Sequence, residues 1–235
     1  MRKQLLLALL AMPGTLIGAR LGMRTYHALN DRNFYDLVLA LLFFGGPPPH
    51  VLVAIDGRAD RYGAEYTLTH VSRGARHLHR YLPRLGLRRY ANVGATLVHY
   101  TGYEYPAETI EVNDTLLRRI GQMLGTADII AQMSDRCYLE KCRDRLYPEF
   151  VIGGVAMQRE DDGGLKVLYG SGLDVLRQTP QFFESTMRTR LDGEFEGVYR
   201  YVECLYGGRN PYMEAINRNH DYLARVLETG NWNML

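Results

Sequence analysis

The chain has little cysteine and little net charge, and each shortage excludes a class of protein. Its 235 residues include three cysteines, Cys137, Cys142 and Cys204. An odd and sparse set does not form a disulfide framework, and Cys137 and Cys142 lack the short CxxC spacing of a zinc or redox site. We therefore expect the cysteines to be small buried side chains in a reducing compartment.

The charge balance gives no nucleic-acid signal. The formal net charge is +2, which is too small to indicate nucleic-acid binding by itself. The sequence also contains no P-loop and no GxSxG nucleophile motif. What is present is ordinary globular composition, with 46% hydrophobic and 23% charged residues, so the chain can bury a substantial core.

The N-terminal third lacks an apolar run long enough to cross a membrane. The runs Leu5–Met12 and Leu37–Phe44 are far shorter than the roughly 18 residues that a spanning helix needs. The N-terminus nevertheless resembles a secretory signal. It has a basic start, then the first of these apolar runs, and then small residues near Ala19. The favoured prediction is a cytoplasmic protein that begins with a helix, and the alternative is export through segment 1–19.

The remaining pattern is mainly helical. Pro83 and Gly86 should end one of the helices, and Asn113 is the predicted N-cap of another. Two strand-like runs, 150–158 and 165–169, flank a polar turn and predict a small β-hairpin near residues 150–170. We find no repeat or linker, so one mainly α domain over 1–235 is expected. Apolar spacing predicts its helices at 20–45, 64–82, 91–99, 114–125, 126–145, 175–191, 195–206 and 212–227.

Three polar residues have a spacing that suits a metal site. His70, His99 and Asp128 are separated by 29 residues in each case, about one helix and a connection. Successive helices of a bundle can therefore direct one of these side chains each toward a common centre. Two imidazoles and a carboxylate suit a divalent metal, which can acidify a bound water and hold a phosphate oxygen.

Two segments resemble the HD superfamily of metal-dependent phosphohydrolases. Residues Ala95–Tyr103 (ATLVHYTGY) are similar to the family's apolar run that ends in His-Asp, a small residue, glycine and an aromatic. Residues Gly125–Asp135 (GTADIIAQMSD) are similar to a GTADLxxQMxD segment of some HD proteins. The resemblance covers about residues 64–150, and it implies an HD-like helical bundle that hydrolyses phosphomonoesters or phosphodiesters, nucleotides included.

The resemblance also implies roles for particular residues. His70, His99 and Asp128 match the ligands of one divalent ion, Mn, Fe, Zn or Mg, with His99 and Asp128 as the catalytic pair. Arg73 and Arg136 are the candidates for holding the substrate phosphate.

The chain departs from the family at Tyr100, which stands where the metal-binding aspartate is expected. A phenol ionises near pH 10 and binds hard divalent ions poorly. Glu104 and Asp135 are the candidate replacement carboxylates. The alternative interpretation is therefore a catalytically degenerate HD domain, without metal, that acts as a ligand-binding or protein-interaction module.

The expected partner is a small phosphorylated molecule or a nucleotide, and a homo-oligomer is an open alternative. A basic stripe could form a rim that attracts phosphates, although a solvated helix face is the favoured explanation. The stripe consists of Arg76, Arg80, Arg84 and Arg88.

Overall fold

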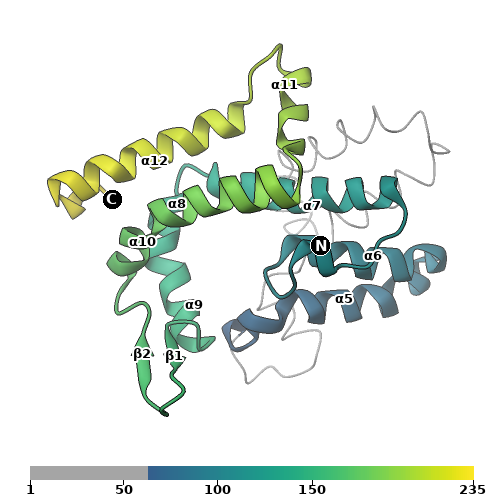
Figure 1. The fold of residues 1–235 in the computed structure, drawn as a ribbon, viewed down its shortest axis with the longest axis horizontal. Helices are drawn as coiled ribbons and strands as arrows, with labels where there is room; N and C mark the ends of the chain where they lie inside the picture. Colours follow the sequence, from purple (N-terminus) through teal and green to yellow (C-terminus); the bar gives the residue numbers. More distant parts are fainter. Residues whose placement is uncertain (1–62) are drawn as a thin grey trace, which may run out of the picture. The chain divides into compact units, whose positions relative to one another are not determined.

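A computed structural model describes residues 63–235, and these are mainly helical with one two-stranded hairpin, as predicted (Figure 1). The predicted signal-like segment 1–19, the helix 20–45 and the run Leu37–Phe44 lie outside the described residues. Within the part of the chain that is described, no helix is both long and apolar enough to cross a membrane.

The chain folds into two compact units, and each is described separately. The described part of the first unit is Val71–Ala131 and Leu191–Pro211, and that of the second is 63–70, 132–190 and Tyr212–Leu235. The boundary in the N-terminal part falls inside a helix, between His70 and Val71. The expectation of one domain over 1–235 stays a prediction.

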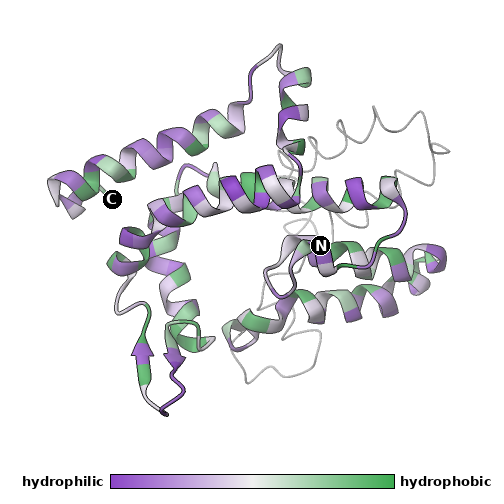
Figure 2. Cartoon of the chain, in the orientation of Figure 1, coloured by the Kyte–Doolittle hydropathy of each residue, from purple (hydrophilic) through white to green (hydrophobic). Residues whose placement is uncertain are grey.

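The first unit is built on an amphipathic helix, α5 (His70–Tyr81), which Figure 2 shows with polar and apolar residues in alternating bands. Its buried residues pack with α6 (Ala91–Leu97) and with the 3₁₀ turn Val98–Thr101. A 3₁₀ turn, Leu82–Leu85, follows α5 and ends at Gly86, whose φ of 77° lies in the left-handed region. The core cluster comprises Val71, Ala75, Leu78, Leu82, Ala91 and Val98.

The long helix of this unit is α7 (Thr115–Met133), and it corrects two predictions. The predicted break after Gly125 is wrong, because the helix continues through that residue. A Cβ at Gly125 would lie 2.6 Å from Cζ of Phe195, so the glycine permits close packing rather than ending the helix. The predicted N-cap is also displaced by one residue, because Asp114 Oδ1 accepts from the backbone N–H groups of Leu116 and Leu117 at 2.8 and 3.0 Å.

The second unit is held by a core of apolar side chains from its middle and C-terminal helices. The buried members of this core are Leu139, Cys142, Val175, Leu176 and Leu223. Burial raises the pKa of the Cys142 thiol to about 11, so this cysteine is a neutral core side chain, as expected. The same expectation is wrong for the other two cysteines, because Cys137 is half-buried and Cys204 is exposed. The helices are α8 (Tyr138–Lys141), α9 (Tyr147–Ile152), α10 (Gly172–Ser185) and α12 (Pro211–Thr229), with a π-helical segment at Cys142–Leu146.

The hairpin is shorter than predicted. Strand β1 (Met157–Arg159) pairs antiparallel with β2 (Leu165–Val167), with Met157 opposite Val167. The predicted strand start at residue 150 is wrong, because α9 runs to Ile152 with Pro148 in its first turn, a position that tolerates proline.

The remaining short elements complete both units. The segment after α10 is π-helical rather than α-helical over Thr186–Glu194, and α11 covers Tyr201–Leu205. Further 3₁₀ segments lie at Gly63–Thr69, Arg88–Tyr90, Ala107–Thr109, Val198–Arg200 and Trp232–Met234.

Candidate anion-binding pocket

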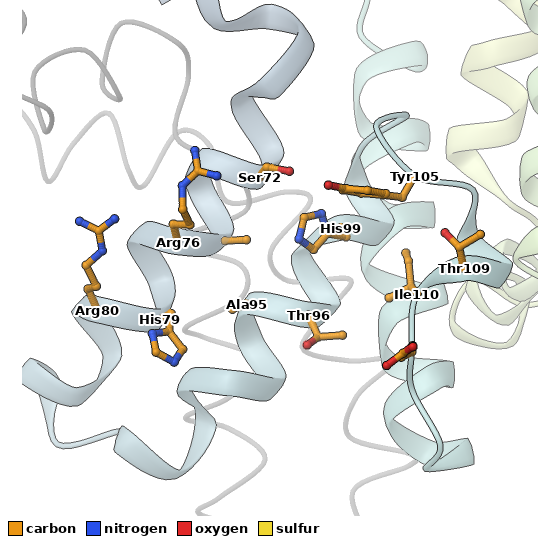
Figure 3. A pocket seen from close by; sticks show the side chains of 12 residues that line it. Ser72, Arg76, His79, Arg80, Ala95, Thr96, His99, Tyr105, Thr109 and Ile110 are labelled. Carbon is orange, nitrogen blue, oxygen red and sulfur yellow. The ribbon is translucent and has the colours of Figure 1, made fainter.

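An open pocket of about 670 Å³ lies within the first unit (Figure 3). Its walls come from α5, from α6 with the 3₁₀ turn that follows it, and from the connection between residues 105 and 111. The lining residues combine a few apolar side chains with charged, hydroxyl and aromatic ones. They are Ser72, Ala75, Arg76, His79, Arg80, Ala95, Thr96, His99, Tyr105, Thr109, Ile110 and Glu111.

One wall of the pocket is basic. Arg76, His79 and Arg80 stand three and four positions apart on α5, which places them on one side of the helix. His79 Nε2 lies 3.0 Å from Oδ1 of Asn92. Both arginines are exposed, and the ion pairs seen within residues 63–235 involve neither of them. Among the described residues, neither guanidinium group is held by a carboxylate.

His99 lies at the inner side of the pocket. It follows α6 on the 3₁₀ turn Val98–Thr101, and its ring meets that of Tyr105 edge to face, with 5.2 Å between centroids. Its Nδ1 is buried and has no hydrogen-bond partner among the residues that the structure describes. Burial lowers the pKa of His99, and the nearby Glu104 carboxylate partly offsets this effect. The imidazole is therefore mainly neutral at pH 7, and its Nδ1 is a buried polar atom without a hydrogen bond among the described residues.

Glu104 lies close to His99, and hydrogen bonds occupy its carboxylate. Its Oε1 accepts from the backbone N–H of Val71 at 2.8 Å, and its Oε2 accepts from that of Ser72 at 3.1 Å. The Ser72 hydroxyl donates to the same Oε2. Glu104 thus satisfies the free N–H groups at the start of α5 and complements the positive end of the helix dipole.

Tyr100 belongs to the core. Its side chain is 2% exposed, and its ring centroid lies 6.2 Å from that of Phe195. A Cβ at Gly121 would lie 2.5 Å from Cδ2 of Tyr100, so the ring contacts the backbone of α7 directly. Burial raises the pKa of the Tyr100 phenol. The position at which the family would have its aspartate therefore holds a neutral ring in a space shaped for it.

Neither His70 nor Asp128 lines the pocket. His70 is the first residue of α5, belongs to the second unit and donates from Nδ1 to the carbonyl of Thr67 at 2.6 Å. Asp128 is a half-buried residue of α7 in the first unit. No group of three or more His, Cys, Asp or Glu side chains in residues 63–235 is placed to hold a metal ion.

Asp135, Arg136 and Arg73 also lie outside the pocket lining. Asp135 accepts from Lys141 Nζ at 2.5 Å and from the backbone N–H of Cys137 at 2.7 Å. The hydrogen bond from Lys141 is the main reason that the pKa of Asp135 is lowered. Arg136 is exposed in the second unit, whereas Arg73 is half-buried on α5 in the first.

The pocket contains residues that sequence reasoning missed. Arg76 and Arg80 were visible as part of a four-residue repeat, and both are exposed and line the pocket, whereas Arg84 and Arg88 do not. The phosphate-attracting role of that stripe stays a prediction. Tyr105, Thr109 and Glu111 come from an irregular connection, and no periodicity marked them. Glu111 stands among other acidic residues, Glu104, Glu108 and Asp114, so its charge gave no signal either.

Comparison with family models, curated proteins and solved structures finds no match to this chain. The HD-like part of the fold prediction and the roles assigned to His70, His99 and Asp128 therefore stay predictions.

Proposed function

We propose that the first unit is a ligand-binding module that holds a small phosphate ester through Arg76 and Arg80, without metal and without hydrolysis. The observation that supports this most directly is the pair of exposed arginines, one helical turn apart, at a pocket that also presents His99. This function corresponds to the degenerate alternative among the sequence-based interpretations.

The chemistry of the wall suits a phosphate. Each guanidinium presents five N–H donors in a planar fork that matches two oxygens of a phosphate. Hydrogen bonds to a charged group contribute about 1.5–3 kcal/mol each, more than neutral ones. The hydroxyl groups of Ser72, Thr96 and Thr109 already donate to Glu104 and to the carbonyls of Asn92 and Pro106, so the arginines are the main donors for a phosphate. A phosphate ester would therefore be held by charge and by hydrogen bonds together.

The surroundings of His99 support binding rather than metal-dependent hydrolysis. The ring of Tyr100 packs on α7, and the Glu104 carboxylate is used at the start of α5. Neither residue offers the carboxylate that an HD-type metal centre would need next to His99. An aspartate at position 100 would be buried against Phe195 and glycine backbone, where an unpaired charge is strongly unfavourable.

Titration of the isotopically labelled full chain with ethyl phosphate, followed by NMR in the presence of EDTA, tests the proposal. We expect saturable shifts at residues that line the pocket. Arg76→Ala and Arg80→Ala should each weaken binding about tenfold or more, the loss of a charged hydrogen bond. Arg84→Ala is the matched control, because Arg84 is exposed just beyond α5 and does not line the pocket. Equal weakening by the control, or no shift at all, would overturn the proposal.

A second assay separates binding from catalysis. The protein loaded with manganese, zinc or iron should show no turnover in a screen of phosphomonoesters and phosphodiesters. Reproducible turnover that disappears in Asp128→Ala would favour the metal-dependent hydrolase instead.

A further inference from the structure

The connection between α5 and α6, at one end of this helix pair in Figure 1, is strongly basic. It carries Arg84, Arg88 and Arg89, and all three side chains are exposed. Between Glu65 and Glu104 the sequence contains no acidic residue. The ion pairs seen within residues 63–235 involve neither Arg84 nor Arg88. The first unit therefore has a local concentration of positive charge that the small net charge of the chain, +2, does not reveal.

The same connection leaves an apolar side chain outside the core. Its turn is closed by backbone hydrogen bonds, from the N–H of Gly86 to the carbonyl of Pro83 at 3.2 Å and from that of Leu87 to the carbonyl of Leu82 at 2.9 Å. Leu82 is buried in the core cluster of the first unit, and Leu87 packs against that cluster. Leu85, in contrast, is 49% exposed. The turn thus presents a leucine to solvent among exposed arginines.

We propose that this connection is a docking site for an anionic lipid surface. Its contact residues are Arg84, Leu85, Arg88 and Arg89, which we call the basic tip. Each arginine near an anionic membrane surface raises the affinity by about fivefold. Leu85 enters the headgroup region, while the long arginine side chains keep their charged ends in water. The inference is independent of the proposed phosphate-ester site, because no residue of the basic tip lines the pocket.

A lipid surface fits the basic tip better than a nucleic acid does. Proteins that bind single-stranded nucleic acids combine basic grooves with aromatic rings on which the bases stack. Tyr90, the aromatic residue that follows the basic tip, is half-buried, and the guanidinium of Arg89 lies over its ring at 4.6 Å from the centroid. A phosphate backbone gains nothing from an exposed leucine, whereas Leu85 leaves water when it enters the headgroup region.

Sedimentation of the full chain with lipid vesicles tests the proposal. One set of vesicles is phosphatidylcholine alone, and the other contains phosphatidylcholine and phosphatidylglycerol in equal amounts. We expect binding to the anionic vesicles to be about tenfold tighter or more, and to weaken as salt screens the headgroups. Arg88→Ala should lose about fivefold in affinity for the anionic vesicles. Leu85→Ser should lose about threefold or more, because the leucine no longer leaves water.

Two control variants change the same residue types in the second unit. Arg218→Ala removes an exposed arginine of α12, and Leu68→Ser removes a leucine that is 62% exposed. Both should keep the affinity of the unchanged chain. Equal binding to the two kinds of vesicle, or an unchanged affinity in Arg88→Ala, would overturn the proposal. Tighter binding to a duplex oligonucleotide than to the anionic vesicles would also overturn it, in favour of a nucleic-acid surface.

Discussion

Several charged side chains of the second unit have partners close in sequence, whereas Arg76 and Arg80 of the first unit, unlike its Arg119 and Arg200, form no ion pair within residues 63–235. Lys141 pairs with Asp135 at 2.5 Å, Arg143 with Asp144 at 2.7 Å and Arg177 with Asp174 at 2.7 Å. Such exposed pairs contribute roughly 0–1 kcal/mol each. Their presence therefore says little about stability.

The comparison is more informative about which guanidinium groups lack a carboxylate contact among the described residues. A guanidinium that already contacts a carboxylate must give up that contact to bind a ligand phosphate. Arg76 and Arg80 have no such contact to lose within residues 63–235, and a pocket lies beside them. Within residues 63–235, Arg76 and Arg80 thus differ from Lys141, Arg143 and Arg177, each of which contacts a carboxylate.

The largest effect on the free energy of unfolding is expected from Tyr100→Asp, which changes a core residue next to His99. The change removes a buried ring and places a carboxylate against Gly121 and Phe195. We expect a loss of about 4 kcal/mol of unfolding free energy, the cost of an emptied and charged core position. Tyr100→Phe, which keeps the ring, should lose about 1 kcal/mol. Urea unfolding measures both, and a stable Tyr100→Asp variant that binds a divalent metal would contradict this account of the position.

A smaller effect is expected from Glu104→Gln, which weakens the cap of α5. Loss of the charged cap should cost about 1 kcal/mol of unfolding free energy. The same change removes the carboxylate that raises the pKa of His99, so the pKa of the histidine should fall further. An NMR titration of the imidazole checks this shift. An unchanged pKa for His99 would show that the two groups do not interact.

The sign of the pH dependence follows from the same histidine. Because the folded pKa of His99 lies below the ordinary value of 6.5, the unfolded chain binds the proton first. The contribution of His99 to the free energy of unfolding is therefore fully present above about pH 6.5. It declines as the pH falls toward the folded pKa. Glu104→Gln should deepen this decline, because it widens the gap between the two pKa values.

The smallest effect is expected in the second unit, at Asp135. Its pKa is lowered mainly by the hydrogen bond from Lys141, so its contribution is present above about pH 3.8 and is lost as the pH falls toward the lower folded value. Because the side chain is more than a third exposed, the contribution should stay below about 1 kcal/mol. Urea unfolding at pH 5 and pH 3 should show a smaller pH dependence in Asp135→Asn than in the unchanged chain. An identical pH dependence would contradict the role of the pair.

The sequence predicted most of the described helices, because apolar spacing reflects the side of a helix that is buried. The prediction at Gly125 was wrong, because the sequence alone does not distinguish a glycine that ends a helix from one that makes room for a neighbouring ring. The sequence pattern also extended the strand before Met157 into α9, because a short apolar run does not distinguish a strand from a buried helix. The local sequence pattern therefore predicts which elements form more accurately than it predicts the residues at which they begin and end.

The site was less predictable than the fold. His99 was identified as a functional candidate, and it does line the pocket. The hydrogen bond between Glu104 and the start of α5 joins residues 33 positions apart. No spacing rule anticipates such a contact. Tyr105 and Glu111 belong to an irregular connection, so only the folded chain brings them to the wall that faces α5.

The most direct test of the central claim is the affinity for ethyl phosphate with and without EDTA, in the unchanged chain and in Arg76→Ala. We predict the same affinity in both conditions for the unchanged chain and a loss of about tenfold in the variant, because arginine side chains hold the phosphate. Binding that requires added manganese, persists in Arg76→Ala and disappears in Asp128→Ala would contradict the account and indicate a metal-dependent site.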